Sequence, residues 1–305
     1  MVLRVAVVGA GGVGGWFGAK LANLPSVSLT FVLRDGAHAT AILSNGLRVL
    51  EPTGSFCVQP VRMLFSEDLL SGATATPEPF DVVIVCVKGY HLQQVVPVIK
   101  RLIRPAGGPP TAVLPLLNGM DAITTLVEGL GPESVLGGMT LILSEICEPG
   151  VILLRKAPPT IVFGERGSGP GPLARTVALL RAALLQAGSM NVVVPAFEDG
   201  GIERFVWEKF VNICPFSAVC AICRASIDQV LAVPRGVRLY ESLLAESCAV
   251  AQAYGISYPG LFDEEWRGAR CADLKRLPAG SSASLSRDII ACLLYTSPSP
   301  RDGLL

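Results

Sequence analysis

The residues of this chain with the clearest chemistry form a glycine-rich segment near the amino terminus. An apolar run precedes the segment and a helical pattern follows it, as in a turn that binds a dinucleotide. In such a turn the first glycine permits a tight bend, the second lets a pyrophosphate approach the backbone, and the third lets the helix pack closely. The phosphates lie on amides at the helix amino terminus. We expect cofactor contacts from the whole segment, which is Gly9, Ala10, Gly11, Gly12, Val13 and Gly14. The alternative is a glycine-rich turn without a ligand.

A cation follows the second apolar run. Arg34 lies twenty residues after Gly14, where an NAD-binding chain usually has an acidic residue. A guanidinium there can hold a 2′-phosphate through paired hydrogen bonds, so Arg34 favours NADP(H) over NAD. Asp35 could instead bind the ribose hydroxyls or pair with Arg34. The remaining interpretation of Arg34 is an ordinary solvated charge.

Two polar residues follow later apolar runs. Lys88 comes after Val83 to Val87, and Asn118 comes after Leu114 to Leu117. At the carboxyl ends of parallel strands, both would point into the crevice where open α/β sheets bind ligands. Both could then reach the nicotinamide end of the cofactor and the substrate. The alternatives are a solvated charge for Lys88 and a plain turn for Asn118 and Gly119.

Two further segments complete an ordered set of motifs, namely Trp207-Glu208-Lys209 and Ser284-Leu285-Ser286-Arg287-Asp288. Together with the glycine segment, Arg34, Lys88 and Asn118, they resemble the ketopantoate reductase (2-dehydropantoate 2-reductase) family in order and approximate spacing. The resemblance covers residues 2 to about 291. It implies an oxidoreductase of pantothenate biosynthesis that uses NADP(H) to reduce a 2-oxo acid.

The resemblance also implies roles for individual residues. Lys88 and Asn118 would contact cofactor and substrate around the reacting carbonyl. Lys209 corresponds to the general acid, Ser284 to the serine that holds the substrate carboxylate, and Asp288 to an acid that helps to order the site. Without the family, Ser281 to Ser286 is equally the start of a serine-rich helix.

Lys209 is the candidate catalytic residue. It lies in an apolar helical segment, where a lysine is poorly solvated unless it faces a cleft. Ketone reduction needs a proton on oxygen as hydride reaches carbon, and an ammonium with a reference pKa of about 10.4 can donate it at neutral pH. The alternative is a lysine whose stem covers the core while its head reaches water. Trp207 is most simply a core residue.

The residues after Lys209 depart from the family. Many members have asparagine four and eight residues after the catalytic lysine, where this chain has Ile213 and Ser217. Asn212 is one position away, which turns its side chain by about 100° on a helix. Ser217 can still bind a substrate hydroxyl or carboxylate, whereas Ile213 cannot. The change favours a different or looser 2-oxo acid pocket.

The end of the chain also departs from the family pattern. The family helix would continue to a glutamate where this chain has Thr296. Pro298 and Pro300 would block a helix. We expect residues 292–305 to form a non-native or disordered tail, and the helical domain before it to be truncated.

Alternating apolar runs and helical patterns must position these residues. The runs of the first half are typical of strands in a buried parallel sheet: Leu3 to Val8, Leu29 to Leu33, Asp81 to Val87, Thr111 to Leu117, Leu136 to Leu143, Val151 to Arg155 and Thr160 to Gly164. Helical patterns cover Trp16 to Leu24, Ala37 to Asn45, Leu92 to Ile103 and Leu173 to Ala187. The alternation predicts an α/β fold that begins with a Rossmann-type, doubly wound domain.

The pattern changes near residue 198. Ile202 to Phe216, Val219 to Val230 and Gly236 to Tyr254 have apolar residues at helical spacing and few strand signals. We therefore expect a mostly α-helical carboxy-terminal domain. The predicted domains are 1–197 for NADP binding and 198–291 for substrate binding and catalysis.

Composition excludes several classes of protein. Half of the 305 residues are hydrophobic and 16% are charged, which disfavours long disorder. Lys plus Arg (25) balances Asp plus Glu (25), so nothing favours nucleic acid as a partner. Glycines and polar residues interrupt the apolar stretches, so no membrane span or membrane partner is expected. The first residues lack a secretory pattern, which predicts a cytoplasmic protein. A homodimer is left open.

The nine cysteines are an odd number, scattered through apolar segments, which favours reduced and buried thiols. Cys220 and Cys223 form one C-x-x-C pair, but the chain has no second pair and only two histidines, His38 and His91. We expect neither a metal site nor a redox function.

Two further functions stay open. The first is an NADP-binding protein without turnover, because Ile213, Thr296 and the shortened end weaken the catalytic half. The second is a reductase of another 2-oxo or 3-hydroxy acid on the same fold.

Overall fold

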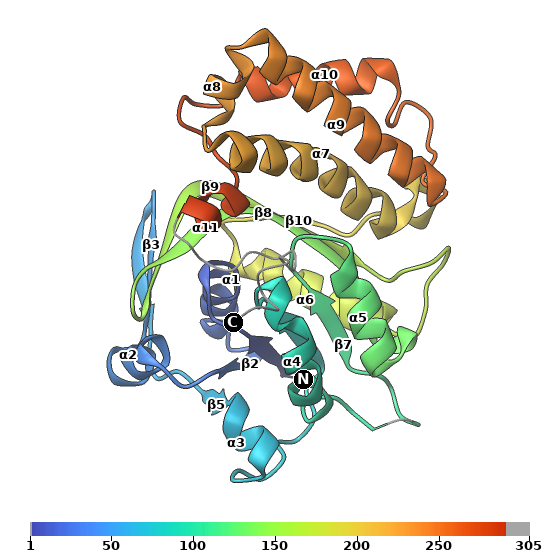
Figure 1. Cartoon of the computed structure of the whole chain (residues 1–305). Helices are drawn as coiled ribbons and strands as arrows, with labels where there is room; N and C mark the ends of the chain where they lie inside the picture. The colour runs from blue at the N-terminus through green and yellow to red at the C-terminus, as the bar shows by residue number, and fades with distance from the viewer. Residues whose placement is uncertain (1, 106, 291–305) are drawn as a thin grey trace. The chain divides into compact units, whose positions relative to one another are not determined.

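The computed structural model describes residues 2–105 and 107–290, and Thr296 and the predicted tail lie outside them. The chain divides into two compact units, Met1–Glu203 and Arg204–Leu305, here called the amino-terminal unit and the carboxy-terminal unit (Figure 1). The division falls in the first turn of a long helix, a few residues after the predicted boundary between 197 and 198.

A parallel sheet forms the centre of the amino-terminal unit. Its strand order is β5-β2-β1-β6-β7, and all four pairings are parallel. The strands are β1 (Leu3–Val8), β2 (Val27–Leu33), β5 (Met63–Phe65), β6 (Val82–Val85) and β7 (Ala112–Pro115). Because the strands are parallel, their carboxyl ends lie along one edge of the sheet.

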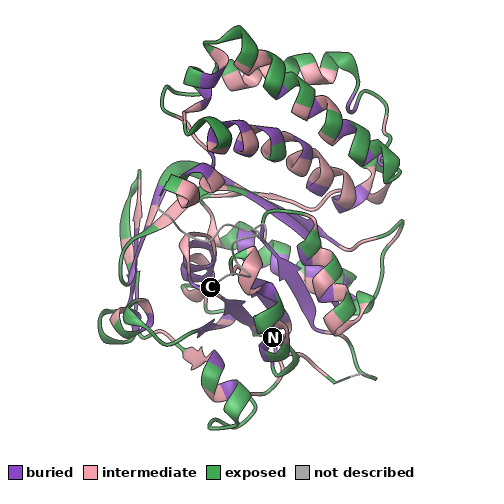
Figure 2. Cartoon of the chain, viewed as in Figure 1, coloured by how far each residue is buried: buried purple, intermediate pink, exposed green. Residues whose placement is uncertain are grey.

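Both faces of this sheet are buried (Figure 2). Val5 and Val7 pack in one apolar cluster with helix α1 (Gly12–Ala22), whereas Ala6 and Val8 pack in a second cluster with helices α4 (Leu92–Lys100) and α5 (Asp121–Leu130). Burial on both faces explains why the strands are continuous apolar runs. The predicted doubly wound arrangement is confirmed.

A second sheet has the order β10-β9-β3-β4, and β8 pairs with β9. Its strands are β3 (Leu47–Glu51), β4 (Gly54–Val58), β8 (Gly137–Glu148), β9 (Val151–Gly164) and β10 (Asn191–Val193). The prediction of two strands over 151–164 is wrong, because β9 runs unbroken through an exposed stretch that includes Pro158. Helix α6 (Ala174–Ala187) packs on this side of the unit.

A buried carboxylate fixes helix α1 against strand β3. The Trp16 indole Nε1–H donates to Glu51 Oε1 at 2.7 Å, and Lys20 Nζ lies 2.9 Å from Glu51 Oε2. The side chains of Lys20 and Glu51 are only 11% and 8% exposed. Ionised partners this deeply buried are costly to separate, so the group holds the axis of α1.

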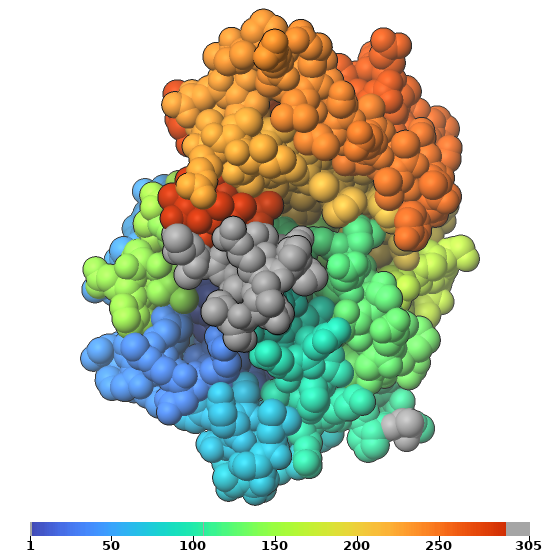
Figure 3. Space-filling view, viewed as in Figure 1, coloured from blue at the N-terminus to red at the C-terminus, as the bar shows by residue number. Residues whose placement is uncertain are grey.

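Short helices complete the surface of the unit. Helices α2 (Ala37–Asn45) and α3 (Ser66–Ser71) follow β2 and β5, and the 3₁₀ helix η1 (Gly89–His91) follows β6. In the space-filling view, α2 in blue, α3 in light blue, α4 in teal and α5 in green contribute to the drawn face of this unit (Figure 3).

The carboxy-terminal unit contains five helices in its described residues. They are α7 (Gly201–Cys223), α8 (Ile227–Leu231), α9 (Pro234–Ala253), α10 (Glu264–Lys275) and α11 (Ser284–Ile290). Its core includes the buried side chains of Val211, Tyr240, Leu244 and Phe262. The predicted, mostly α-helical second domain is confirmed.

One boundary within this unit was wrongly predicted. Ile202 to Phe216 and Val219 to Val230 were expected as separate helical segments, but α7 continues through the buried Pro215 to Cys223. The break comes later, where Ser226 and Gln229 form a capping box that starts α8.

One helical stretch, Phe197–Cys223, is long and apolar enough to cross a membrane by length and composition alone. The most apolar window in this stretch is 44% buried inside the structure. A core helix of a soluble protein passes the same test, so this finding does not favour a membrane protein.

Candidate cofactor and catalytic sites

The glycine segment forms the turn between β1 and α1. Gly9 has φ +94°, which favours glycine, and its N–H donates to Val32 O at 3.0 Å. A Cβ on Gly14 would lie 2.0 Å from Gly9 O and 2.8 Å from Cys86 Cβ. Glycine at 9 and 14 is therefore required by the turn and by close packing of the helix on the strands.

The middle of the segment is open. An added Cβ on Gly11 would meet nothing within 4 Å among the described residues. Gly11 is the N-cap of α1 and makes no side-chain cap, and the first turn of α1 contains no acidic residue. The first backbone N–H groups of α1 lack intrahelical partners and lie at the positive end of the helix. This combination fits a phosphate group, so the residues suit the pyrophosphate of a dinucleotide.

Strand β8 closes one side of this turn. A Cβ on Gly12 would lie 2.5 Å from Ser144 O, so the backbone of β8 lies directly against the start of α1. Ser144 Oγ is buried and makes no hydrogen bond among the described residues. Ser144 could not be recognised from the sequence, because no pattern in β8 indicates its contact with the turn.

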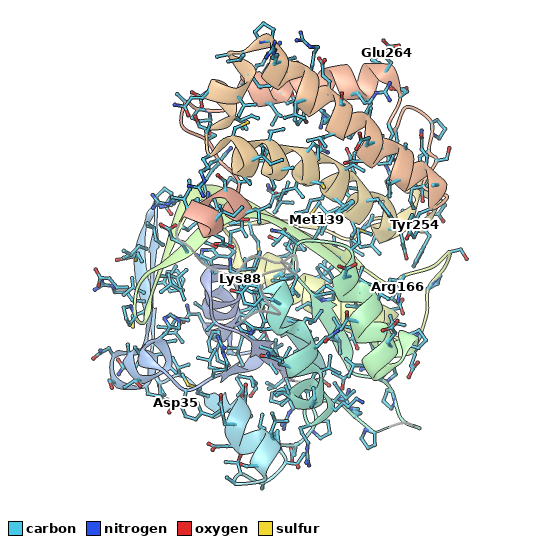
Figure 4. All side chains as sticks on the ribbon, viewed as in Figure 1. Asp35, Lys88, Met139, Arg166, Tyr254 and Glu264 are labelled. Carbon is cyan, nitrogen blue, oxygen red and sulfur yellow. The ribbon has the colours of Figure 1, made fainter. Side chains whose placement is uncertain are left out.

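Arg34 and Asp35 follow β2 and are exposed. Asp35 Oδ1 accepts a hydrogen bond from the N–H of Gly36 at 2.7 Å, so one carboxylate oxygen is used within its own loop. Burial lowers the pKa of His91, a hydrogen bond with Gln94 opposes this effect, and the Arg34 charge adds to the lowering. Asp35 and Lys88 are labelled in Figure 4.

Lys88 and Asn118 lie at the ends of neighbouring strands. Lys88 is the N-cap of η1 after β6, and Asn118 follows β7. Both residues are exposed. Because β1, β2, β6 and β7 are parallel, the glycine turn, Arg34, Lys88 and Asn118 all lie at the same edge of the sheet. The structure therefore brings together the predicted cofactor residues of this unit.

Lys209 lies in the first half of α7 and is half-buried. Burial lowers the pKa of its ammonium to about 8. A group with this pKa is still mainly protonated at neutral pH and releases its proton more readily than an exposed lysine. A lysine with this pKa can donate a proton at neutral pH.

The residues after Lys209 have distinct environments. Asn212 Nδ2 donates to Glu208 O at 2.7 Å, so this amide is bonded to its own helix. Ile213 is half-buried and Ser217 is buried. Asn212 is thus poorly suited to replace the asparagine expected at 213.

Helix α11 carries Ser284 and Asp288. Both are half-buried, and their spacing of four places them on one face of the helix. Ser286 Oγ donates to Cys220 O at 3.3 Å, and the N–H of Ile227 donates to Ser281 O at 2.9 Å. The first bond attaches α11 to α7, and the second attaches the segment that precedes α11 to the start of α8. Ser286 is nearly fully buried, and no sequence pattern indicates that it joins α11 to α7.

The described residues contain no group of three or more His, Cys, Asp or Glu side chains that could hold a metal ion. Burial raises the pKa of the Cys220 thiol. A raised pKa reduces the thiolate fraction that redox chemistry requires.

Two family models match the chain. Residues 5–168 match "Ketopantoate reductase PanE/ApbA", and residues 201–293 match "Ketopantoate reductase PanE/ApbA C terminal". The chain is 29% identical over 266 residues to the uncharacterized oxidoreductase YkpB of Bacillus subtilis, covering 87% of this chain and 80% of that protein. It is 28% identical over 255 residues to a 2-dehydropantoate 2-reductase of Halobacterium salinarum, covering 84% and 77%.

Solved structures share the fold. A 2-dehydropantoate 2-reductase of Geobacter metallireducens superposes with a TM-score of 0.79 at 24% identity, covering 96% of this chain and 89% of that chain. A D-mandelate dehydrogenase in complex with NADH and anilino(oxo)acetate gives a TM-score of 0.76 at 17% identity, covering 95% and 86%.

Proposed function

Since this chain belongs to the ketopantoate reductase family, we propose that it is an NADPH-dependent reductase of 2-dehydropantoate or a close 2-oxo acid analogue. The observation that carries the proposal is the sheet edge where the glycine turn, Arg34, Lys88 and Asn118 meet. A dinucleotide needs anion-binding amides and polar groups at such an edge.

The amino-terminal unit binds and orients the cofactor in this proposal. The amides from Gly11 to Gly14 hold the pyrophosphate, and the Arg34 guanidinium holds the 2′-phosphate. Lys88 and Asn118 contact the nicotinamide end and the substrate near its carbonyl. When bound, NADPH supplies the hydride for the carbonyl carbon.

The carboxy-terminal unit binds the substrate and moves the proton. Lys209 Nζ donates a proton to the carbonyl oxygen as negative charge develops there. Ser284 donates a hydrogen bond to the substrate carboxylate, and Asp288, one turn later, helps to order the site. The hydroxyl of Ser217 contacts a polar group of the substrate.

The choice of substrate has a second candidate. Ile213 stands where a polar amide would contact ketopantoate, which favours a 2-oxo acid with a more apolar side chain. The structural neighbour D-mandelate dehydrogenase was solved with NADH and an aromatic oxo acid analogue. An aromatic 2-oxo acid is therefore the first alternative to ketopantoate.

Absorbance of NADPH measured with ketopantoate and with a panel of aliphatic and aromatic 2-oxo acids tests the proposal, with NADH in parallel. We expect oxidation of NADPH at a higher kcat/KM than NADH. Tight binding of NADPH without oxidation by any member of the panel would instead favour a binding protein without turnover. We further infer a cytoplasmic enzyme without nucleic acid or membrane partners, and a homodimer is to be tested by its molecular mass in solution.

A further inference from the structure

His38 joins three segments of the amino-terminal unit. It lies on α2, which follows the Arg34 loop, and its side chain is half-buried. Its Nε2 lies 2.9 Å from Ala10 O in the glycine turn. Its Nδ1 accepts a hydrogen bond of 3.0 Å from the N–H of Gly150, in the turn between β8 and β9.

These two bonds determine the protonation state of the ring. A backbone N–H can only donate, so Nδ1 must be unprotonated where it faces Gly150. Nε2 then carries the proton and donates it to Ala10 O. Only the neutral imidazole makes both bonds, because a proton on Nδ1 would oppose the N–H of Gly150.

The bond to Ala10 acts on the phosphate-binding turn. Ala10 O and the N–H of Gly11 belong to one planar peptide unit and point in opposite directions. When His38 holds the carbonyl, it therefore aims the N–H of Gly11 away from the ring. Gly11 is the N-cap of α1 and faces open space among the described residues.

The surroundings of His38 disfavour its charged form. Burial lowers the pKa of His38, and the bond to Ala10 O opposes this effect in part. Charged residues on the neighbouring loop and strands include Arg34, Asp35, Arg48, Glu51, Glu145 and Glu148, and none of them is among the causes of the shift. Arg48 lies on β3 and donates its N–H to Gly150 O at 2.9 Å.

We propose that His38 is a positioning residue that holds the phosphate-binding turn in its binding conformation only when neutral, and so makes cofactor affinity fall in acid. The inference rests on the proposed NADPH site. The sign follows from the bonds: protonation removes the acceptor for Gly150, so the binding conformation is favoured above the pKa of His38 and lost below it.

Calorimetric titration of the protein with NADPH tests this role. His38→Gln keeps one donor and one acceptor but does not titrate, whereas His38→Ala removes both. At about pH 8 we expect His38→Ala to raise Kd about tenfold and His38→Gln to change it less than about threefold.

The pH dependence separates positioning from simple structural support. The 2′-phosphate itself titrates near pH 6, so the measured quantity is the ratio of the Kd values of wild type and His38→Gln. We expect this ratio to rise about tenfold between about pH 8 and about pH 5. His91→Gln is the matched control, because it removes the other histidine of the chain. When both proteins carry His91→Gln, the ratio of their Kd values should still rise in acid. An unchanged ratio, or a rise abolished by His91→Gln, would overturn the proposal.

The protein without cofactor gives an independent readout. Nitrogen-15 NMR should find Nδ1 of His38 unprotonated and Nε2 protonated at neutral pH, and His38→Gln should retain slow exchange of the Gly150 amide. A ring protonated at Nδ1 would rule out the role. A wild type that binds neither NADPH nor NADH refutes the proposed function and the cofactor role of His38 together, whereas normal binding with equal pH profiles refutes only the role of His38.

Discussion

The two units build their candidate sites in different ways. In the amino-terminal unit the turn is shaped by missing side chains: Gly9 adopts φ +94°, and Gly14 leaves no space for a Cβ. In the carboxy-terminal unit the candidate groups are side chains on helices, such as Lys209 on α7 and Ser284 on α11. A site built from backbone groups is damaged by substitutions that add atoms. A site built from side chains is damaged by substitutions that remove atoms. The site in the amino-terminal unit should control cofactor affinity, and the site in the carboxy-terminal unit should control turnover.

Removal of the proton donor should have the largest effect. Lys209→Ala is expected to lower kcat by about 10² to 10⁴, the usual contribution of a general acid, while the Kd for NADPH stays within about twofold. Steady-state kinetics and calorimetry measure the two quantities. Lys275→Ala, which changes an exposed lysine of α10, is the control. An equal loss of NADPH affinity would break the separation between the units.

The same lysine predicts a pH profile. Lys209 donates as an ammonium, and burial lowers its pKa to about 8. We expect kcat to be constant below that pH and to fall about tenfold for each unit above it. In Lys209→Arg the residue stays protonated, so whatever activity remains should not decline over this range. An identical decline in that variant would assign the titration to another group.

Added methyl groups should distinguish the two kinds of glycine in the turn. Gly14→Ala places a Cβ 2.0 Å from Gly9 O, so we expect the free energy of unfolding to fall by about 3 kcal/mol. Gly11→Ala meets no described neighbour, so stability should change by less than about 1 kcal/mol while the Kd for NADPH rises at least about tenfold. Thermal unfolding and calorimetry check both. Equal destabilisation by the two variants would contradict the assignment.

Arg34 should affect the choice of cofactor. Arg34→Gln removes charge-assisted bonds to a 2′-phosphate, so the Kd for NADPH should rise about 10- to 100-fold and that for NADH about twofold or less. Arg101→Gln changes another exposed arginine of the same unit and serves as the control. If the Kd values for NADPH and NADH rise by the same factor, Arg34 does not bind the 2′-phosphate.

The smallest expected effect concerns the substrate pocket. Ile213→Asn restores an amide one turn after Lys209, so KM for ketopantoate should fall about two- to tenfold if ketopantoate is the substrate. Ile222→Asn, at a residue of the same helix that is 72% exposed, is the matched control. A higher KM for ketopantoate and a loss of activity toward aromatic oxo acids would favour the second substrate class.

Local patterns predicted part of the fold well. Leu3 to Val8 and Ala37 to Asn45 were expected as a strand and a helix, and β1 and α2 have these bounds. The strands β3 and β4 were missed although they pair with each other as a local hairpin, because each has only five residues and gives little local signal. The pairing of β3 with β9, about a hundred residues later, has no local signal at all. The separation of Ile202 to Phe216 from Val219 to Val230 was wrong, because α7 continues to Cys223 and its packing buries Ser217 and Val219 within the helix.

The features of the candidate site were likewise predictable only in part. The requirement for glycine in the first turn is local and could be predicted from spacing. The apolar segment around Lys209 indicated poor solvation, but whether the side chain is buried or reaches water depends on tertiary packing, which lowers its pKa to about 8. His38 was counted only as a potential metal ligand, because its two partners are 28 and 112 residues away in the sequence.

The buried indole on α1 has an optical consequence. Of the three tryptophans of the chain, Trp16 belongs to the amino-terminal unit, and Trp207 and Trp266 belong to the other. Trp16 is fully buried, and its ring centroid lies 4.9 Å from that of Phe17. Its indole N–H donates a hydrogen bond to Glu51. In a variant with Trp207→Phe and Trp266→Phe, tryptophan fluorescence would come from α1 alone. Its shift to longer wavelength on unfolding would report the melting of the glycine-turn unit separately from that of the helices.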